Sequence, residues 1–242
     1  MRDIDEYNAL QHFNGVSAWL HSHRYKALSR AFERIVGDRA VRVVEIGCAD
    51  AKAFDLLNTR FQIDYVGVEP SDMFIKRANE KYGERSNFRA VHGRIEDHLT
   101  LIEKGSVVLA LEVLEHIRET DVVRILEGIA NARPAAFICS VPVEIGPAIL
   151  LKNVGSFVAG YVRHEEYLWK ETFWAELGNL DRIRPHRRGH RGFNWRWLAQ
   201  TIRHNMEIIE TRRFPINFLP AAFNASVFFV ARPRQRKLKR AP

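Results

Sequence analysis

The chain has 242 residues, of which 46% are apolar and 27% are charged, and its net charge is +8. A chain of this length and hydrophobicity can bury one substantial core, which excludes an intrinsically disordered protein. Its two cysteines, Cys48 and Cys139, are far apart and lack the spacing of metal ligands, so the sequence predicts neither a disulfide framework nor a metal site.

Hydrophobicity also bears on location. No run of about 18 uncharged apolar residues could span a bilayer, and the first ten residues lack the basic-then-apolar layout of a signal peptide. We therefore expect a cytoplasmic protein. Basic residues cluster within 182–191 and 232–240, which suits nucleic acid, anionic lipid or an anionic substrate. For the basic tail, residues 233–242, we expect a frayed, solvated end instead.

The N-terminal part, residues 1–37, is predicted to be a helical lead-in. Apolar residues repeat at helical spacing from Leu28 to Val36, and Gly37 follows directly. We expect this helix to pack on the domain that begins at residue 38.

From residue 38 the pattern changes to short apolar runs that alternate with amphipathic stretches. Five runs are predicted strands: 41–46, 63–69, 87–93, 106–112 and 135–141. Helices are predicted at 51–60, 71–82 and 120–131, the last with Thr120 as its N-cap. Because the strands are apolar on both parities, the sheet should be parallel and covered on both faces. Strands at 206–213 and 224–231 would complete a Rossmann-like, doubly wound α/β sheet of seven strands, mostly parallel, with the last strand antiparallel.

A long segment separates the fifth strand from the last two. Residues 142–193 have an apolar, glycine-containing half and an aromatic, charged half, whereas connections in α/β folds usually take only a few residues. We expect a helical insertion that caps the substrate site; two extra helices that lengthen the core are the alternative. Its apolar half would also allow a lipid-like substrate or peripheral membrane contact.

The first predicted strand ends in EIGCADA, residues 45–51. A dinucleotide-binding turn would need three spaced glycines, whereas here Gly47 is followed by Cys48 and Ala49. A phosphate-binding loop is therefore a poor fit. The acid at the strand end, Glu45, favours a ligand that carries positive charge.

This turn resembles motif I of the class I S-adenosylmethionine-dependent methyltransferases, small-molecule type. Three later strand ends resemble the family's other motifs in order and at βα spacing: VGVEPS, HGRIED and LALEVLEHI, which contains Glu115. The resemblance covers about residues 38–145 and implies an enzyme with S-adenosyl-L-methionine as cofactor. It implies that the cofactor is bound by Glu45, Gly47, Cys48, Ala49, Glu69, Pro70, Arg94, Ile95, Glu112 and Val113. Within this set Glu69 would accept hydrogen bonds from the ribose hydroxyls, and Ile95 would cover the purine.

Two alanines depart from the family pattern. Ala49 and Ala51 stand where the motif usually has glycine. If either position needs a positive φ, the cost is on the order of 1 kcal/mol, and a methyl group could crowd the cofactor. We therefore expect weaker or slightly displaced cofactor binding.

On the acceptor side, the run HRGFNWRWL resembles a segment found late in many small-molecule methyltransferases. It makes Arg191 and Phe193 candidate substrate contacts and His190 a candidate base, with a scaffold role at the start of a helix capped by Asn194 as the alternative. His116, after the fourth strand, is the rival base because an imidazole titrates near neutral pH. Glu112 could contact the methionine end of the cofactor or the acceptor.

The sequence thus favours methyl transfer to a small-molecule, sugar or lipid-like acceptor at oxygen. An RNA methyltransferase is the first alternative, favoured by the basic clusters; against it, LEVLEHI replaces the Asn-Pro-Pro-Tyr type of motif that holds a flipped base. The second alternative is a non-catalytic binding protein that retains the fold, favoured by the altered glycine turn.

Overall fold

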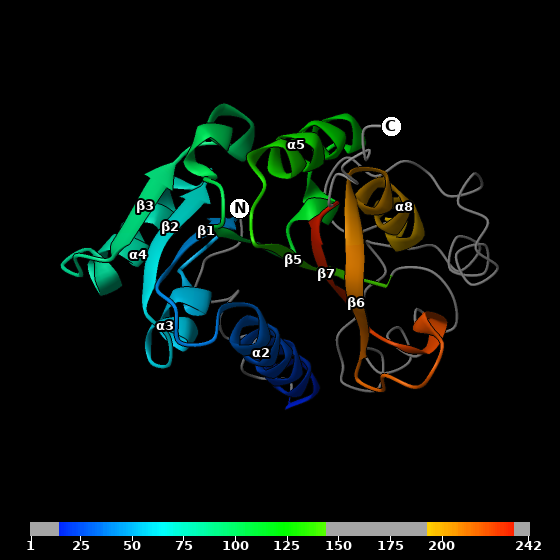
Figure 1. Cartoon of the computed structure of the whole chain (residues 1–242). Coiled ribbons are helices and arrows are strands. Elements are labelled where there is room, and N and C mark those ends of the chain that lie inside the picture. The colour runs from blue at the N-terminus through cyan, green and yellow to red at the C-terminus, as the bar shows by residue number, and fades with distance from the viewer. Residues whose placement is uncertain (1–14, 144–192, 235–242) are drawn as a thin grey trace, which may run out of the picture.

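The computed structural model of the chain describes residues 15–143 and 193–234, which form one seven-stranded sheet with helices on both faces (Figure 1). The strands are β1 (Val41–Ile46), β2 (Ile63–Glu69), β3 (Phe88–His92), β4 (Val107–Leu111), β5 (Ala136–Pro142), β6 (Met206–Phe214) and β7 (Ser226–Pro233). The α-helices are α2 (Gly15–Val36), α3 (Lys52–Asn58), α4 (Asp72–Tyr82), α5 (Glu119–Ala132) and α8 (Trp195–Asn205). Short 3-10 helices are η1 (Ile95–Asp97), η2 (Leu99–Leu101), η3 (Leu114–His116) and η5 (Ala221–Phe223).

The strand order is β3-β2-β1-β4-β5-β7-β6. Neighbours from β3 to β5 pair in parallel, whereas β7 is antiparallel to both β5 and β6. β7 is therefore the one reversed strand of this sheet, as the sequence predicted. The order reverses between β1 and β4, and ligands of such sheets bind at the carboxyl edge near that point.

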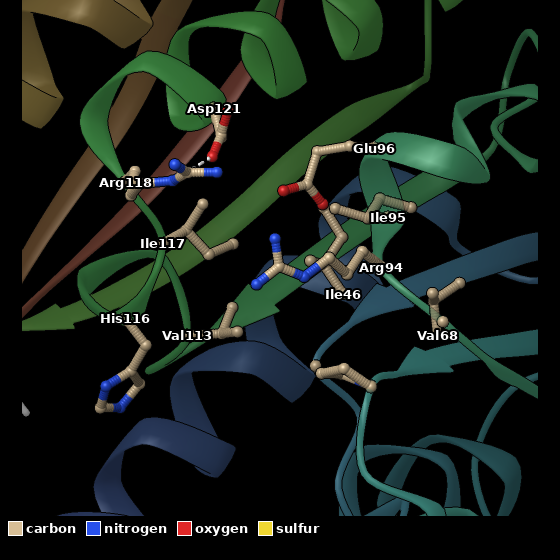
Figure 2. A pocket seen from close by; sticks show the side chains of 13 residues that line it. Ile46, Val68, Arg94, Ile95, Glu96, Val113, His116, Ile117, Arg118 and Asp121 are labelled. Atoms are coloured by element: carbon tan, nitrogen blue, oxygen red, sulfur yellow. Dashed lines mark hydrogen bonds and ion pairs between the residues drawn. The ribbon is translucent and has the colours of Figure 1, made fainter. Parts of the chain in front are cut away.

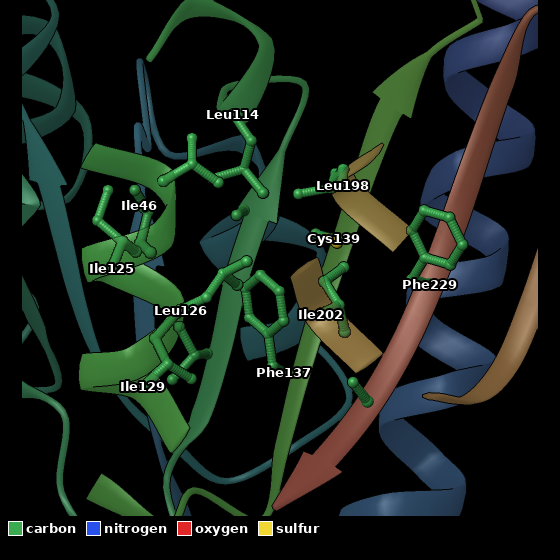
Figure 3. Close-up of a cluster of buried hydrophobic side chains, with 14 of the residues drawn as sticks. Ile46, Leu114, Ile125, Leu126, Ile129, Phe137, Cys139, Leu198, Ile202 and Phe229 are labelled. Carbon is green, nitrogen blue, oxygen red and sulfur yellow. The ribbon is translucent and has the colours of Figure 1, made fainter. Parts of the chain in front are cut away.

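Each face of the sheet is covered by its own hydrophobic cluster. Because side chains alternate along a strand, Val43 belongs to the cluster beneath α2 and α3, and Val44 belongs to the cluster beneath α5 and α8. In the second of these, Figure 3 shows Phe137 of β5 between α5 residues such as Leu126 and α8 residues such as Ile202. The predicted doubly wound architecture is confirmed.

The predicted helix boundaries hold in two places and fail in one. α2 ends at Val36, and Gly37 follows with a φ of +58°, a conformation that favours glycine. Asn194 caps α8, since its side-chain oxygen accepts hydrogen bonds from the backbone N–H of Arg196 at 3.0 Å and of Trp197 at 3.2 Å. Thr120, however, lies inside α5, which begins at Glu119.

The position of that helix start has an electrostatic reason. The first turn of α5 carries the acids Glu119 and Asp121, and negative charge is favourable at a helix N-terminus. Arg118, at the N-cap, donates from Nε to the Asp121 carboxylate at 3.0 Å.

The predicted insertion, residues 142–193, lies almost wholly outside the described residues. β7 extends to Pro233, one residue into the predicted tail.

Candidate active site

A pocket opens at the carboxyl ends of β1, β2, β3 and β4 (Figure 2). Its walls are largely apolar: Ile46, Val68, Ile95, Val113 and Ile117. It encloses about 180 Å³, less than the roughly 300 Å³ at which pockets for a whole small-molecule ligand begin. The pocket is thus suited to one apolar portion of a larger ligand.

The turn after β1, residues 47–51, passes close to Val113, which lies in the wall of this pocket. Gly47 has a φ of +65°, and a Cβ placed on it would lie 2.4 Å from Cγ2 of Val113. Glycine is therefore required at this position. Ala49 and Ala51 also have positive φ values, 46° and 59°. The free-energy cost of a positive φ therefore applies to both alanines, because the left-handed region is unfavourable for a residue with a Cβ.

An Ala49→Gly variant is therefore expected to be more stable than the wild-type protein, by about 1 kcal/mol. The backbone N–H of residue 49, which donates to Glu69, is kept in this variant. Denaturant unfolding measures the difference. Ala130→Gly in α5 is the matched control, where the same change should destabilise by about 0.5–1 kcal/mol. A destabilised Ala49→Gly protein would contradict the interpretation.

Glu69 lies buried at the end of β2, beside the pocket. One carboxylate oxygen accepts a hydrogen bond from the backbone N–H of Ala49 at 3.1 Å, and the other accepts one from the N–H of Ser71 at 3.0 Å. Burial raises the pKa of Glu69, and the two backbone donors oppose that shift. Each oxygen retains capacity for a second hydrogen bond, so the carboxylate can accept from two neighbouring hydroxyls of a ligand. The next residue, Pro70, lines the pocket.

Glu45, at the end of β1, is almost fully buried and accepts a hydrogen bond from the hydroxyl of Tyr65. Burial raises its pKa to about 8, although the Tyr65 hydroxyl and the charge of Arg24 oppose the shift. The side chain is therefore mostly protonated at neutral pH. A cationic ligand group nearby would favour its ionised form.

Arg24 was not predicted from the sequence as a site residue. It extends from α2 to the end of β4, where its Nη1 lies 3.3 Å from a carboxylate oxygen of Glu112, a residue with a φ of 55°. Near the turn thus lie one cationic side chain, Arg24, and two acidic side chains, Glu112 and Glu45. Such a group is suited to the amino and carboxyl ends of an amino acid. The only sequence signal was the position of Arg24 in a helix leading into β1.

The turn after β3 provides the next wall. Ile95 is buried and lines the pocket, and its position over a purine stays a prediction. Arg94 is exposed, and Figure 2 shows its guanidinium group extending into the space between Ile46 and Ile117. A cation at this position can contact the exposed edge or face of a bound ring.

Cys48 is placed differently from the other predicted cofactor residues. Its side chain is buried in the cluster beneath α2 and α3, where a Cβ added to Gly67 would lie 2.4 Å from its Sγ. Burial raises the pKa of this thiol well above its ordinary value. The thiol therefore packs in the core, away from the pocket, and only the backbone of Cys48 lies in the turn.

The structure describes one of the two predicted bases. His116 lies in η3, exposed and lining the pocket, with its imidazole directed away from the apolar wall (Figure 2). His190 and Arg191 lie outside the described residues. Phe193 is half-buried and packs against the cluster beneath α5 and α8.

Arg118 and Asp121 are among the pocket residues that the sequence did not predict. They form the ion pair at the start of α5 and close one side of the cavity (Figure 2). Opposite charges three residues apart at a helix start carry no signal that a pocket lies beside them. Within 15–143 and 193–234, no group of three or more His, Cys, Asp or Glu side chains is arranged to hold a metal ion. In the same ranges no helix is long and apolar enough to cross a membrane.

Residues 44–133 match a family model described as a methyltransferase domain. A comparison with curated protein sequences gave no match. Among solved structures, the CurJ carbon methyltransferase matches 96% of this chain and 59% of its own length, with a TM-score of 0.62 and 14% identity.

Two other similar structures are enzymes crystallised with S-adenosylhomocysteine. Magnesium protoporphyrin IX methyltransferase from Synechocystis PCC 6803 has a TM-score of 0.62 at 14% identity, covering 96% of this chain and 94% of that one. Geranyl diphosphate C-methyltransferase from Streptomyces coelicolor A3(2) has a TM-score of 0.56 at 12% identity, covering 86% and 76%. At these identities the likeness shows the fold. Residues 44–133 thus match a methyltransferase domain model, and the chain has the fold of the class I S-adenosylmethionine-dependent methyltransferases.

Proposed function

We propose that the protein transfers a methyl group from S-adenosylmethionine to a small-molecule, sugar or lipid-like acceptor, at oxygen. The observation that carries the proposal is the position of Glu69. Its buried carboxylate is held by two backbone N–H groups beside a pocket with apolar walls. An acceptor-only group next to an apolar slot is the arrangement that a nucleoside without phosphates requires, because its ribose offers two hydroxyl donors.

The residues present fit this cofactor along its length. Ile95, Val68 and Val113 would contact the adenine, and Glu69 would accept from the ribose hydroxyls. At the other end, Arg24 with Glu45 and Glu112 would hold the charged methionine groups. When bound, the cofactor supplies an electrophilic methyl group on its sulfonium.

His116 is the proposed base. Its exposed imidazole lies at the carboxyl edge, on the rim of the pocket, where it can take a proton from an acceptor hydroxyl as the oxygen attacks. The choice of oxygen rests on this residue. The names of the two cofactor-bound neighbours, which act on magnesium protoporphyrin IX and geranyl diphosphate, support an acceptor that is a small molecule.

The RNA alternative is favoured by the basic clusters, but the described part of the C-terminal cluster is engaged within the fold. Arg232 pairs with Glu207 at 3.0 Å, and Arg234 donates to the backbone carbonyl of Arg203. The binding-protein alternative is favoured by the strained backbone at Ala49 and Ala51.

Calorimetric titration with S-adenosylmethionine and S-adenosylhomocysteine tests the cofactor assignment, with NAD as the control ligand. We expect both sulfur compounds to bind and NAD not to bind. Transfer of a labelled methyl group to panels of hydroxylated small molecules, lipids and RNA then identifies the acceptor class. Failure to bind either sulfur compound would refute the proposal; binding without transfer to any panel would favour the binding protein.

A further inference from the structure

The connection between β6 and β7, residues 215–225, presents large apolar side chains to solvent. Phe218 is 86% exposed, Phe223 is 48% exposed and Ile216 is 38% exposed. In Figure 1 this connection is the orange segment with a short helix that follows β6. Three such side chains within eight residues are more than the scattered exposed apolar residues that soluble surfaces normally carry.

A buried asparagine holds this connection in one conformation. Asn224 is fully buried; its side-chain oxygen accepts from the backbone N–H of Ile216 at 2.8 Å, and its side-chain nitrogen donates to the carbonyls of Leu219 and Pro220. Several backbone groups of the connection are thus hydrogen-bonded within it, while Phe218 and Phe223 are exposed. Such a preorganised loop loses little entropy when its apolar side chains become buried against a partner.

The connection lies at the carboxyl edge of the sheet, like the pocket. β6 runs in the same direction as β1 to β5, so its last residue, Phe214, ends at that edge. The backbone N–H of Val143, just after β5, donates to the carbonyl of Ala225 at 2.9 Å. A partner bound by the connection would therefore face the side of the molecule on which the acceptor must enter.

Positive charge accompanies the apolar residues. Arg213 is held beside the connection, because its Nη1 donates to the carbonyl of Asn217 at 3.2 Å and its backbone N–H donates to the Asn217 side chain at 3.0 Å. Among the residues that the structure describes, no ion pair joins Arg213 to an acid. The sequence contains no Asp or Glu from Thr211 to its last residue.

α2 adds two further exposed cations, Arg30 and Lys26. Arg34 pairs with Glu210 of β6, and Arg24 reaches Glu112 at the end of β4, so the N-terminal direction of α2 leads toward the carboxyl edge. Arg30 and Lys26, both exposed, lie one and two turns from Arg34 on the same side of the helix. This row of cations therefore leads toward the edge of the sheet at which the β6–β7 connection lies.

We propose that the β6–β7 connection docks the protein on an anionic lipid bilayer. Phe218 and Phe223 insert at the level of the headgroups, and Arg213, Arg30 and Lys26 face the lipid phosphates. Exposed aromatic side chains next to cations are the combination that gives interfacial binding. A second copy of the chain fits less well, because a two-fold contact would bring the same positive charges together. This inference is independent of methyl transfer.

Co-sedimentation with vesicles tests the proposal. The full chain is expected to bind vesicles of phosphatidylcholine with 30% phosphatidylglycerol and to bind pure phosphatidylcholine more weakly. The Phe218→Ser/Phe223→Ser double variant should lose at least about tenfold in partitioning onto the anionic vesicles, and Arg213→Gln about fivefold. The matched control is Ile209→Ser, which removes a 46%-exposed apolar side chain from the middle of β6 and should bind like wild type.

A site-specific probe gives a second readout. Both native cysteines are buried, so a Phe218→Cys variant can be labelled at that position with an environment-sensitive fluorophore. Its emission should shift to the blue when anionic vesicles are added, and less with vesicles of pure phosphatidylcholine. The proposal is overturned if wild type does not sediment, if the double variant sediments equally well, or if the label is already blue-shifted without lipid. The last result would mean that another part of the chain or a second copy covers the connection.

Discussion

A Glu69→Gln variant is expected to bind S-adenosylmethionine and S-adenosylhomocysteine at least tenfold more weakly than wild type. The amide replaces one acceptor oxygen with an NH₂ group, which cannot accept from a ribose hydroxyl. In the wild-type protein the backbone N–H groups of Ala49 and Ser71 both donate to the carboxylate. In the variant, the NH₂ group faces one of these two donors. A buried donor left without an acceptor costs about 1–3 kcal/mol, and the middle of that range, about 2 kcal/mol, corresponds to a loss of about thirtyfold.

The control is Glu80→Gln on α4, an exposed residue whose ion pair with Lys76, at 4.0 Å, is too exposed to matter for binding or stability. Calorimetry measures the affinities, and thermal unfolding of the free proteins separates a loosened turn from a lost ligand contact. Unchanged affinity in a folded Glu69→Gln protein would refute the proposed cofactor position.

Cofactor affinity is expected to rise as the pH increases from 6 toward 8, by up to about tenfold for each pH unit. The pKa of Glu45 in the free protein is about 8 because burial disfavours its charged form. A bound sulfonium or ammonium group would favour that charged form, so binding at pH 7 should release a proton. Titrations in buffers of different ionisation enthalpy measure the number of protons released.

The free protein should respond to pH in the opposite sense. Because the pKa of Glu45 is about 8 in the folded state and near 4.5 in the unfolded state, folding takes up a proton between these values. The stabilisation that this provides is fully present below pH 4.5 and is lost as the pH rises through 8. Glu45→Gln should remove both effects, leaving cofactor affinity nearly independent of pH in this range. Zero proton release by wild type at pH 7 would contradict the predicted role of Glu45.

The fold was predictable from the sequence because its signals are local. Apolar runs such as 41–46 and 63–69 coincide with β1 and β2, since a strand buried on both faces must be apolar at consecutive positions. The start of α5 was predicted less well, because Thr120 and Glu119 are both acceptable near a helix N-terminus and only the ion pair of Asp121 distinguishes them.

The site was predictable only in part. Residues at strand ends, such as Glu69 and Ile95, could be placed because parallel strands bring their carboxyl ends to one edge. The direction of the Cys48 side chain could not, since it depends on the space over Gly67 in the neighbouring strand.

By itself, then, the sequence determined the order of helices and strands, the parallel sheet and the row of acids at its carboxyl edge, because periodicity and strand ends are properties of short segments. Only the tertiary structure decided that Arg24 meets Glu112, that burial raises the pKa of Glu45, and that Phe218 faces solvent. These depend on which groups from distant segments become neighbours and on how much water remains around them. Neither quantity is set by any short stretch of the chain.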